Sequence, residues 1–442
     1  MMRKLLICML LMAAMLLVAA SAEENAMTVL MYVSGDDLES EDGFAQEDFE
    51  ELLHLKIPKD SPVRVLVLTG GCEDWWNEAI PETCIAVHEI SEMGMQTVEA
   101  WEQASMGDAE TLSRFIRFGM EHAPAQRTAL VLWGHGDGPT GGVCSDPLFY
   151  DDFLLPDEFG SALRSALPQG DKLDAVIFDS CLMASIDFAQ AISERAKYMV
   201  ASQENTVGDG LRYDRWIGAL IENPNMETED WCCHAAQTYV ENNDHGRFGE
   251  LATMSVLNLE HAQATFNAVE MLSAALLNRL EADESAVLER RSRLKSYGEY
   301  EDEDPSDQID ALLAADVFSD IAPEACAEVR RSIEQMIVCN AVTGDMVGEA
   351  NGLSLLMPYS VGAWSAQVQG WYQQTAEQSA YSALNVRLSQ MAEARYNAAQ
   401  GTIGEIGSAL QELWSGVKIA MSIIEDIAAP ENPADMWEGL LK

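Results

Sequence analysis

The sequence predicts an α/β fold in which a mostly parallel sheet is flanked by helices, with an additional helical region at the C-terminus. Two observations predict this fold class. Short, continuously apolar runs rich in β-branched residues recur through the first 260 residues, as expected for strands buried on both faces. Segments with helical apolar spacing lie between these runs, and alternating strands and helices are typical of such a sheet.

Seven of the apolar runs are expected to be strands of the sheet. They occupy residues 28–32, 63–69, 85–88, 128–133, 175–178, 198–202 and 253–257. Helices are expected over 108–121, 157–167 and 183–195. Asp108 and Asp157 are the expected N-caps, because an Asp side chain accepts hydrogen bonds from the free N–H groups of a first helical turn.

After about residue 258 the pattern becomes mainly helical. One long helix is expected over 260–297, followed by a polar, acidic break at 298–307 that we interpret as a solvated loop rather than a metal site. Helical segments resume across 308–338, and a last strand is expected at 352–357.

The first 22 residues have the pattern of a cleavable secretory signal. Arg3 and Lys4 precede an apolar stretch, and Ala20, Ser21 and Ala22 supply the small residues that a signal peptidase recognises. Cleavage after Ala22 would deliver the protein to the periplasm or the medium. An uncleaved membrane anchor is the alternative, but the apolar run is short for a span, so we expect no membrane span in the mature chain.

The charge of the chain excludes one large class of partners. Its 442 residues include 26 Lys and Arg against 73 Asp and Glu, a net charge of -47 that becomes -49 when Arg3 and Lys4 leave with the signal. So acidic a surface repels phosphate backbones, which excludes general nucleic-acid binding and favours cationic peptides. Solubility of a secreted protein is an alternative reason for the charge.

Cysteine usage predicts neither a disulfide scaffold nor a metal centre. Nine cysteines become eight when Cys8 leaves with the signal, too few for a disulfide-dense domain. No CxxC pair and no Cys/His cluster with zinc spacing is present, so no metal site is expected. A local bridge between Cys72 and Cys84 is compatible with the sequence.

Two strand ends carry residues that could take part in catalysis. His135 lies between two glycines directly after the run at 128–133, and Cys181 follows the run at 175–178, with a helix expected just after it. Ligands of open α/β sheets bind beyond the carboxyl ends of the strands. If these two strands are neighbours, the side chains of His135 and Cys181 meet at that edge.

Together the two residues predict a nucleophilic site. A thiol beside a histidine and a helix N-terminus has a lowered pKa and is a competent nucleophile, and the backbone N–H groups of Gly136 and Cys181 are candidates for an oxyanion hole. Alone, such a cysteine is usually a small buried apolar residue, and a loop histidine is usually polar surface. The pair, at two strand-to-loop junctions, favours catalysis.

LVLWGHGDG (130–138) and IFDSCLMAS (177–185) resemble the clostripain family of cysteine peptidases, which shares its fold with caspases, gingipains and legumains. MYVSGDDLE (31–39), YMVASQENTVGDG (198–210) and NGLSLLMPYS (351–360) support the resemblance. It implies a caspase-like peptidase domain over 23–360, between the signal peptide at 1–22 and a mainly helical region at 361–442.

The resemblance also implies roles for individual residues. His135 would be the general base and acid and Cys181 the nucleophile of a thioester mechanism. Family members typically cleave after Arg or Lys, and Asp179 and Asp209 occupy the positions expected to bind that side chain, since a carboxylate gives a cation a charge-assisted partner. The alternatives are a structural role for Asp179 and a turn for Asp209.

Other features of the family fit less well. Asp36 and Asp37 are interpreted as a helix cap and a turn. Relatives often cleave themselves after a basic residue between the two motifs, but residues 138–160 contain no Lys or Arg. The chemistry itself requires no cofactor. Some members depend on calcium, with which the acidic surface is compatible, so calcium binding stays open, although SGDDLESEDG (34–43) lacks EF-hand spacing.

We therefore expect a secreted, monomeric cysteine endopeptidase that cleaves proteins or peptides after Arg or Lys. One alternative is a secreted, non-catalytic binding protein on the same fold, against which the intact His and Cys motifs argue. The other is an asparaginyl peptidase or transpeptidase, whose pocket for a neutral side chain would lack Asp179 and Asp209.

Overall fold

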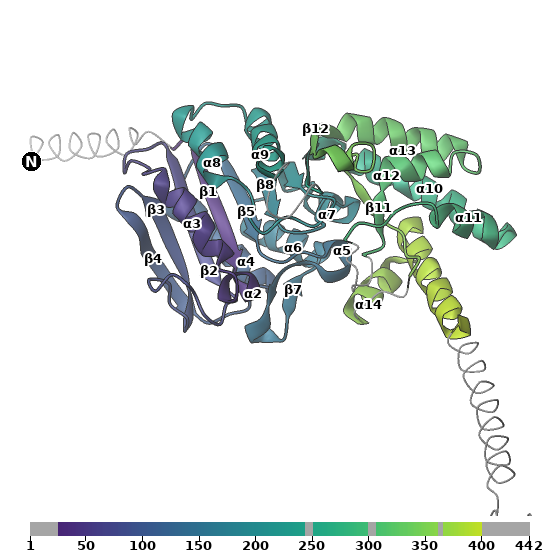
Figure 1. Cartoon of the computed structure of the whole chain (residues 1–442), viewed down its shortest axis with the longest axis horizontal. Coiled ribbons are helices and arrows are strands. Elements are labelled where there is room, and N and C mark those ends of the chain that lie inside the picture. The colour runs from purple at the N-terminus through teal and green to yellow at the C-terminus, as the bar shows by residue number, and fades with distance from the viewer. Residues whose placement is uncertain (1–24, 244–250, 299–305, 361–365, 400–442) are drawn as a thin grey trace, which may run out of the picture. The chain divides into compact units, whose positions relative to one another are not determined.

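A nine-stranded sheet forms the centre of the molecule (Figure 1). The computed structural model describes residues 25–243, 251–298, 306–360 and 366–399. In the order β12-β10-β9-β8-β5-β1-β2-β3-β4, the five strands from β9 to β2 are parallel and the two at each edge are antiparallel. The mostly parallel sheet predicted from the sequence is thus confirmed. The strands are β1 Met27–Ser34, β2 Val63–Gly70, β3 Cys84–Ser91, β4 Gly94–Glu102, β5 Thr128–Trp133, β8 Leu173–Asp179, β9 Ala196–Ala201, β10 Thr253–Asn258 and β12 Ile337–Val342.

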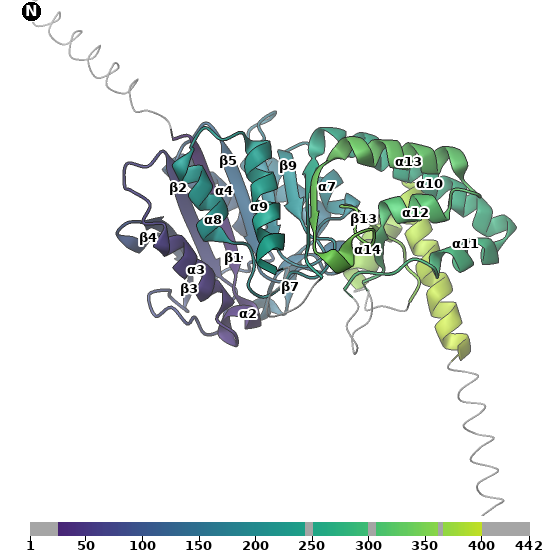
Figure 2. The ribbon, with the colours of Figure 1, turned by 45° about the horizontal axis from the view of Figure 1, so that its top comes forward.

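Helices cover both faces of the sheet, which explains why the central strands are apolar throughout (Figures 1 and 2). On one face, Val131 and Ile177 belong to the core that contains Phe49 and Trp216. On the other, Phe178 packs against the rings of two helical phenylalanines. The first face carries α3 Phe44–His54, α8 Tyr213–Glu222 and α9 Thr228–Asn243, and the second α4 Ala109–His122, α6 Pro156–Ala166 and α7 Ile186–Ile192.

All seven expected strands are present, and the sequence analysis missed two edge strands. β4 mixes polar and apolar residues and is mostly exposed, and β12 is half-buried and interrupted by the polar Asn340. Neither has the continuous apolar run of a central strand. The Asp108 N-cap is confirmed by its bond from the Glu110 N–H. Asp157 is not an N-cap: α6 begins at Pro156, and Leu155 occupies the cap position.

The single long helix expected over 260–297 is wrong. The chain forms α10 Ala262–Ala282 and α11 Glu284–Arg291, separated by Asp283. Asp283 leaves the helical region (φ -160, ψ 87), and its carboxylate accepts a hydrogen bond from the Ala286 N–H. A capping residue therefore ends one helix and starts the next.

The remaining C-terminal elements differ in detail from the expected helices. The segment expected to be helical contains β11 Gln308–Asp310, α12 Ala311–Val317 and α13 Pro323–Met336. β11 pairs with β13 Ser354–Leu356, which confirms the last expected strand. Most of the acidic break, residues 299–305, lies outside the described residues, as does the predicted signal peptide. Among the described helices, none has the length and apolar character needed to cross a membrane.

Helical segments continue beyond residue 360, and the first of two compact units runs to Leu388. α14 Ala366–Thr375 is followed by a helical stretch at 380–399. The hydroxyls of Tyr372 and Tyr381 donate to the two carboxylate oxygens of Asp187 on α7, at 2.9 and 3.1 Å. Burial raises the pKa of Asp187 to about 6, and both tyrosine bonds oppose this shift.

A buried ion pair fastens α11 to the segment before β11. Arg291 and Asp307 are only 2% and 1% exposed, and their charged groups lie 3.1 Å apart. The guanidinium also donates to the backbone oxygens of Met357 and Leu294 and to the Ser296 hydroxyl. With so many bonds satisfied, the cost of burying the two charges is largely offset.

Replacing Arg291 with Met should lower the free energy of unfolding by about 3–5 kcal/mol, because Asp307 would stay buried without a cation. Urea unfolding measures the change. Arg293→Met is the matched control, since Arg293 pairs with Glu289 at the surface and such pairs contribute about 0–1 kcal/mol. Equal effects of the two substitutions would contradict the role assigned to the buried pair.

Candidate active site

Two glycines bring the loop after β5 close to its neighbours. A Cβ atom on Gly134 (φ +138) would stand 2.7 Å from the backbone oxygen of Ser34 at the end of β1. One on Gly136 would stand 2.5 Å from the backbone oxygen of Cys181. Only residues without side chains permit these approaches. The glycines that flank His135 in the sequence thus set the position of its loop.

β5 and β8 are neighbours in the sheet, as the sequence reasoning required. Trp133 and Asp179 are directly paired at the ends of these strands, so the residues that follow them emerge at the same carboxyl edge. His135 and Cys181 both line one small cavity of about 100 Å³. The other residues that line it are Leu38, Phe44, Trp133, Gly134, Asp179, Thr206, Val207, Gly208 and Gly210.

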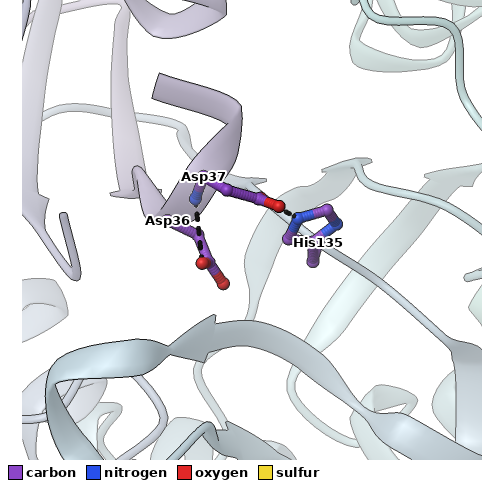
Figure 3. A group of neighbouring side chains, drawn as sticks. All are labelled: Asp36, Asp37 and His135. Atoms are coloured by element: carbon purple, nitrogen blue, oxygen red, sulfur yellow. Dashed lines mark hydrogen bonds and ion pairs between the residues drawn. The ribbon is translucent and has the colours of Figure 1, made fainter. Parts of the chain in front are cut away.

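The imidazole of His135 is held by Asp37, as Figure 3 shows. Its Nε2 lies 2.6 Å from Oδ1 of Asp37, in the short helix α2 Asp36–Ser40 that follows β1. An ionised carboxylate only accepts hydrogen bonds, so Nε2 carries the proton and Nδ1 is the nitrogen left for proton exchange. The sequence analysis assigned Asp37 only to a cap or turn and missed this contact.

The thiol of Cys181 is half-buried and bonded to Thr206. The backbone N–H of Thr206 donates to Sγ at 3.3 Å, and its hydroxyl lies at the same distance. Burial raises the pKa of the thiol, and the negative charges of Asp179 and Glu204 add to the shift, while the bonds from Thr206 oppose it. The raised pKa favours the protonated form of this thiol.

The lowered pKa expected for Cys181 is thus wrong for this arrangement, for two physical reasons. The imidazole of His135 bonds Asp37, and within the described residues it makes no hydrogen bond to the thiol. Helix α7 begins at Ile186 rather than just after the cysteine, because Leu182 adopts a left-handed conformation (φ +65). The helix N-terminus is therefore not at Cys181, and its dipole acts only within the first turn.

Two backbone donors beside the thiol are unused. In the described part of the chain, the N–H groups of Gly136 and Cys181 donate no hydrogen bond to another residue. Unpaired N–H groups at a nucleophile are what a developing oxyanion requires. The pair expected from the sequence is available for that role.

The two acidic residues expected to bind substrate occupy different positions. Asp179 lines the cavity, and its buried carboxylate accepts hydrogen bonds from the Leu211 N–H and the Tyr213 hydroxyl. Burial raises its pKa to about 6. Asp209 is half-buried and does not line the cavity, although Gly208 and Gly210 on either side of it do. The structure therefore brings Asp179, but not Asp209, to the space beside Cys181.

One group of side chains could hold a metal ion among the described residues. Asp36, Asp37 and His135 each offer a ligand atom, all within 4.8 Å of one another (Figure 3). Two carboxylates and an imidazole suit a transition metal better than calcium, which takes six to eight oxygen ligands. A cation bound there would compete for the histidine.

The segment between the two motifs is folded against the end of β1. It forms the hairpin of β6 Val143–Asp146 and β7 Asp152–Leu154. The carboxylate of Asp146 is buried and accepts from the N–H groups of Met106 and Leu148. The Ser145 hydroxyl donates to Asp36. The tip of the hairpin is exposed, with Tyr150 fully accessible, but the segment offers no Lys or Arg for self-cleavage.

Comparison with known proteins agrees with this geometry. A sequence model of the clostripain family matches residues 31–388. The chain belongs to the clostripain family. The resemblance noted in the sequence is thus confirmed.

Individual relatives of this clostripain-family chain are distant. Clostripain from Hathewaya histolytica is 21% identical over 328 residues, which are 62% of this chain and 62% of that protein. A secreted C11 cysteine protease from Bacteroides thetaiotaomicron, solved with an irreversible peptide inhibitor, has a TM-score of 0.59 at 17% identity, over 81% of this chain and 99% of its own. An inactive zymogen C11 protease from Parabacteroides distasonis has a TM-score of 0.59 at 19% identity, over 79% of this chain and 96% of its own. The two structures share the fold.

The eight cysteines of the described residues are free thiols, so the Cys72–Cys84 bridge is not formed.

Because the thiolate is the reactive form, the raised pKa of Cys181 predicts an alkylation rate that is low at pH 7 and still increases above pH 9. Mass spectrometry of the Cys181 peptide after timed treatment with iodoacetamide measures this rate. Cys84, which is half-buried in the same sample, serves as the reference. A rate that reaches its plateau below pH 7 would instead indicate a preformed thiolate.

Proposed function

We propose that this protein is a secreted cysteine endopeptidase that hydrolyses peptide bonds after Arg or Lys. The observation that carries the proposal is the convergence of His135, Cys181 and Asp179 on one cavity at the carboxyl edge of the sheet. A nucleophile, a base and an anionic pocket are the three parts that this reaction needs.

In the proposed mechanism, Nδ1 of His135 takes the thiol proton while Sγ of Cys181 forms a bond to the peptide carbonyl carbon. The Asp37 carboxylate keeps the Nε2–H in place and stabilises the imidazolium as it forms. Because the pKa of the thiol is raised, proton transfer accompanies the attack rather than preceding it. The oxyanion receives hydrogen bonds from the N–H groups of Gly136 and Cys181.

The second half of the reaction uses the same groups. The C–N bond breaks as His135 returns the proton to the leaving amine, which leaves a thioester on Cys181. Water then gives its proton to His135 and attacks the thioester carbon, and the released thiolate regains that proton. Apart from the substrate and this water, every group in these steps belongs to the chain, so we propose that no cofactor is required.

The basic specificity is supported by the charge of the pocket. Asp179 is the acidic residue that lines the cavity beside the nucleophile, and a substrate cation would favour its ionised form. Secretion is supported by the signal pattern of residues 1–22, and one structural relative is described as secreted. An acidic chain is also suited to attract cationic peptides.

Peptides with a fluorogenic group after Arg, Lys, Asn or Asp test the proposal. Mature protein should cleave the Arg and Lys peptides, and Cys181→Ala should abolish the activity, because none of the other described thiols lines the cavity. EDTA should leave the rate unchanged. Cleavage after Asn would keep the nucleophile but reject the anionic pocket, and failure to cleave any peptide would favour a binding protein.

Asp37→Ala tests the positioning of the histidine. Loss of the acceptor frees both tautomers of His135, so kcat should fall roughly 10²-fold with little change in KM. Asp37→Asn, whose amide oxygen still accepts from Nε2, should retain more activity. Asp42→Asn, at an exposed position nearby, is the control for loss of one charge. A raised KM with an unchanged kcat would show instead that Asp37 contacts the substrate and does not orient the base.

A further inference from the structure

A second buried carboxyl group lies beside Asp179. Asp48, on α3, is 4% exposed, and its Oδ2 accepts a hydrogen bond from Nε1 of Trp133 at 2.7 Å. Trp133 is the strand partner of Asp179 and lines the cavity next to Cys181. The side chain that forms one wall of the cavity therefore also holds Asp48 in place.

The two carboxylates converge on one point of that wall. A Cβ atom on Gly210 would lie 3.1 Å from Oδ2 of Asp179 and 3.4 Å from Oδ2 of Asp48. Gly210 lines the cavity, and its left-handed backbone (φ +55) disfavours any larger residue. A glycine at this position places no side chain against the two carboxylates, of which Asp179 lines the cavity and Asp48 does not.

The pair has hydrogen-bond donors but no partner cation. Neutral groups donate to it: the Trp133 indole to Asp48, and the Leu211 N–H and Tyr213 hydroxyl to Asp179. No ion pair of the described residues includes either carboxylate. Arg212, the nearby cation, is bound to Glu51 and Asp214.

The pKa values of the two carboxyl groups reflect the lack of a partner cation. Burial raises the pKa of both carboxyl groups, and the charges of Asp179, Glu51 and Glu47 raise that of Asp48 further. The indole, the Leu211 N–H and the Tyr213 hydroxyl oppose these shifts. Two carboxyl groups in such surroundings resist joint ionisation and tend to retain a proton between them. An entering cation would remove that restriction.

We propose that Asp48 is a second specificity-determining residue, which acts with Asp179 to bind the cationic side chain of the substrate between two carboxylates. The inference rests on the proposed peptidase function and adds a residue that no sequence motif marks. A guanidinium has N–H donors on two edges and can satisfy both carboxylates at once, whereas an ammonium is a single point of charge. Arg is therefore the favoured residue before the cleaved bond.

A pair of peptides that differ only in Arg or citrulline before the cleaved bond tests the role of charge, because citrulline is the neutral isostere. Asp48→Asn should lower the Arg-to-citrulline ratio of kcat/KM about 10-fold or more, while its amide oxygen still accepts from Trp133. Glu50→Gln is the matched control, since it removes one charge from an exposed position on the same helix and should leave the ratio unchanged.

The ratio should also depend on pH. The pKa of Asp179 is raised to about 6, so the pocket loses negative charge as the pH falls through that value. The preference of the unmodified protein for Arg over citrulline should therefore decrease from pH 7 to pH 5. A ratio that stays constant over this range would overturn the proposal, even if Asp48→Asn fails to fold.

Calorimetry separates this proposal from the proposed reaction. Agmatine, a small guanidinium compound, should bind the unmodified protein at pH 6 with proton release, detected by comparing buffers of different ionisation enthalpy. The Asp48→Asn variant should bind agmatine more weakly and release fewer protons on binding. If Asp48→Asn folds and keeps both the wild-type ratio and the proton release while Asp179→Asn loses them, Asp48 is structural only. If agmatine binds as expected but no peptide is cleaved, the proposed peptidase function is wrong, whereas the proposed cation-binding pocket of Asp48 and Asp179 is supported.

Discussion

The parallel register of β1, β5 and β8 is the constraint on which the site depends. These three strands are adjacent and point the same way, so the segments that leave them emerge at one edge although they are distant in the sequence. Asp37, His135 and Cys181 come from these three segments. The hydrogen bond between Asp37 and His135 and the contact of Gly136 with Cys181 both follow from the register. Slipping one strand by a residue would turn its side chains to the opposite face and separate the groups.

The same register decides which face of the sheet holds the pocket. Trp133 and Asp179 are paired in register, and Trp133 belongs to the core beneath α3 and α8. The pocket therefore forms against these helices, where Asp48 and Tyr213 are available. Among the described residues, the two buried acids there are bonded only to neutral donors, and the thiol is half-buried. The resting pocket thus holds two buried acids, and neither belongs to an ion pair among the described residues.

The sequence predicts the parts of the fold that are governed by burial on both faces. The central strands are continuous apolar runs, and His135 and Cys181 were recognisable because each directly follows such a run. Edge strands β4 and β12 escaped prediction because one face is exposed and the apolar signal is weak. Asp37 and Asp48 could not be assigned either. The role of Asp37 depends on the order of strands in the sheet, and Asp48 lies inside a helix where an acidic residue usually faces solvent.

The bonds from Tyr372 and Tyr381 to Asp187 have a consequence for the synthesis of the protein. The carboxyl group and its two donors are separated by 185 and 194 residues. α7, which follows the segment containing Cys181, therefore lacks these partners until most of the chain has left the ribosome. β12, the edge strand next to β10, is likewise made late. A growing chain of this protein carries His135 and Cys181 well before it can complete the packing around them, so the order of synthesis itself delays assembly of the domain.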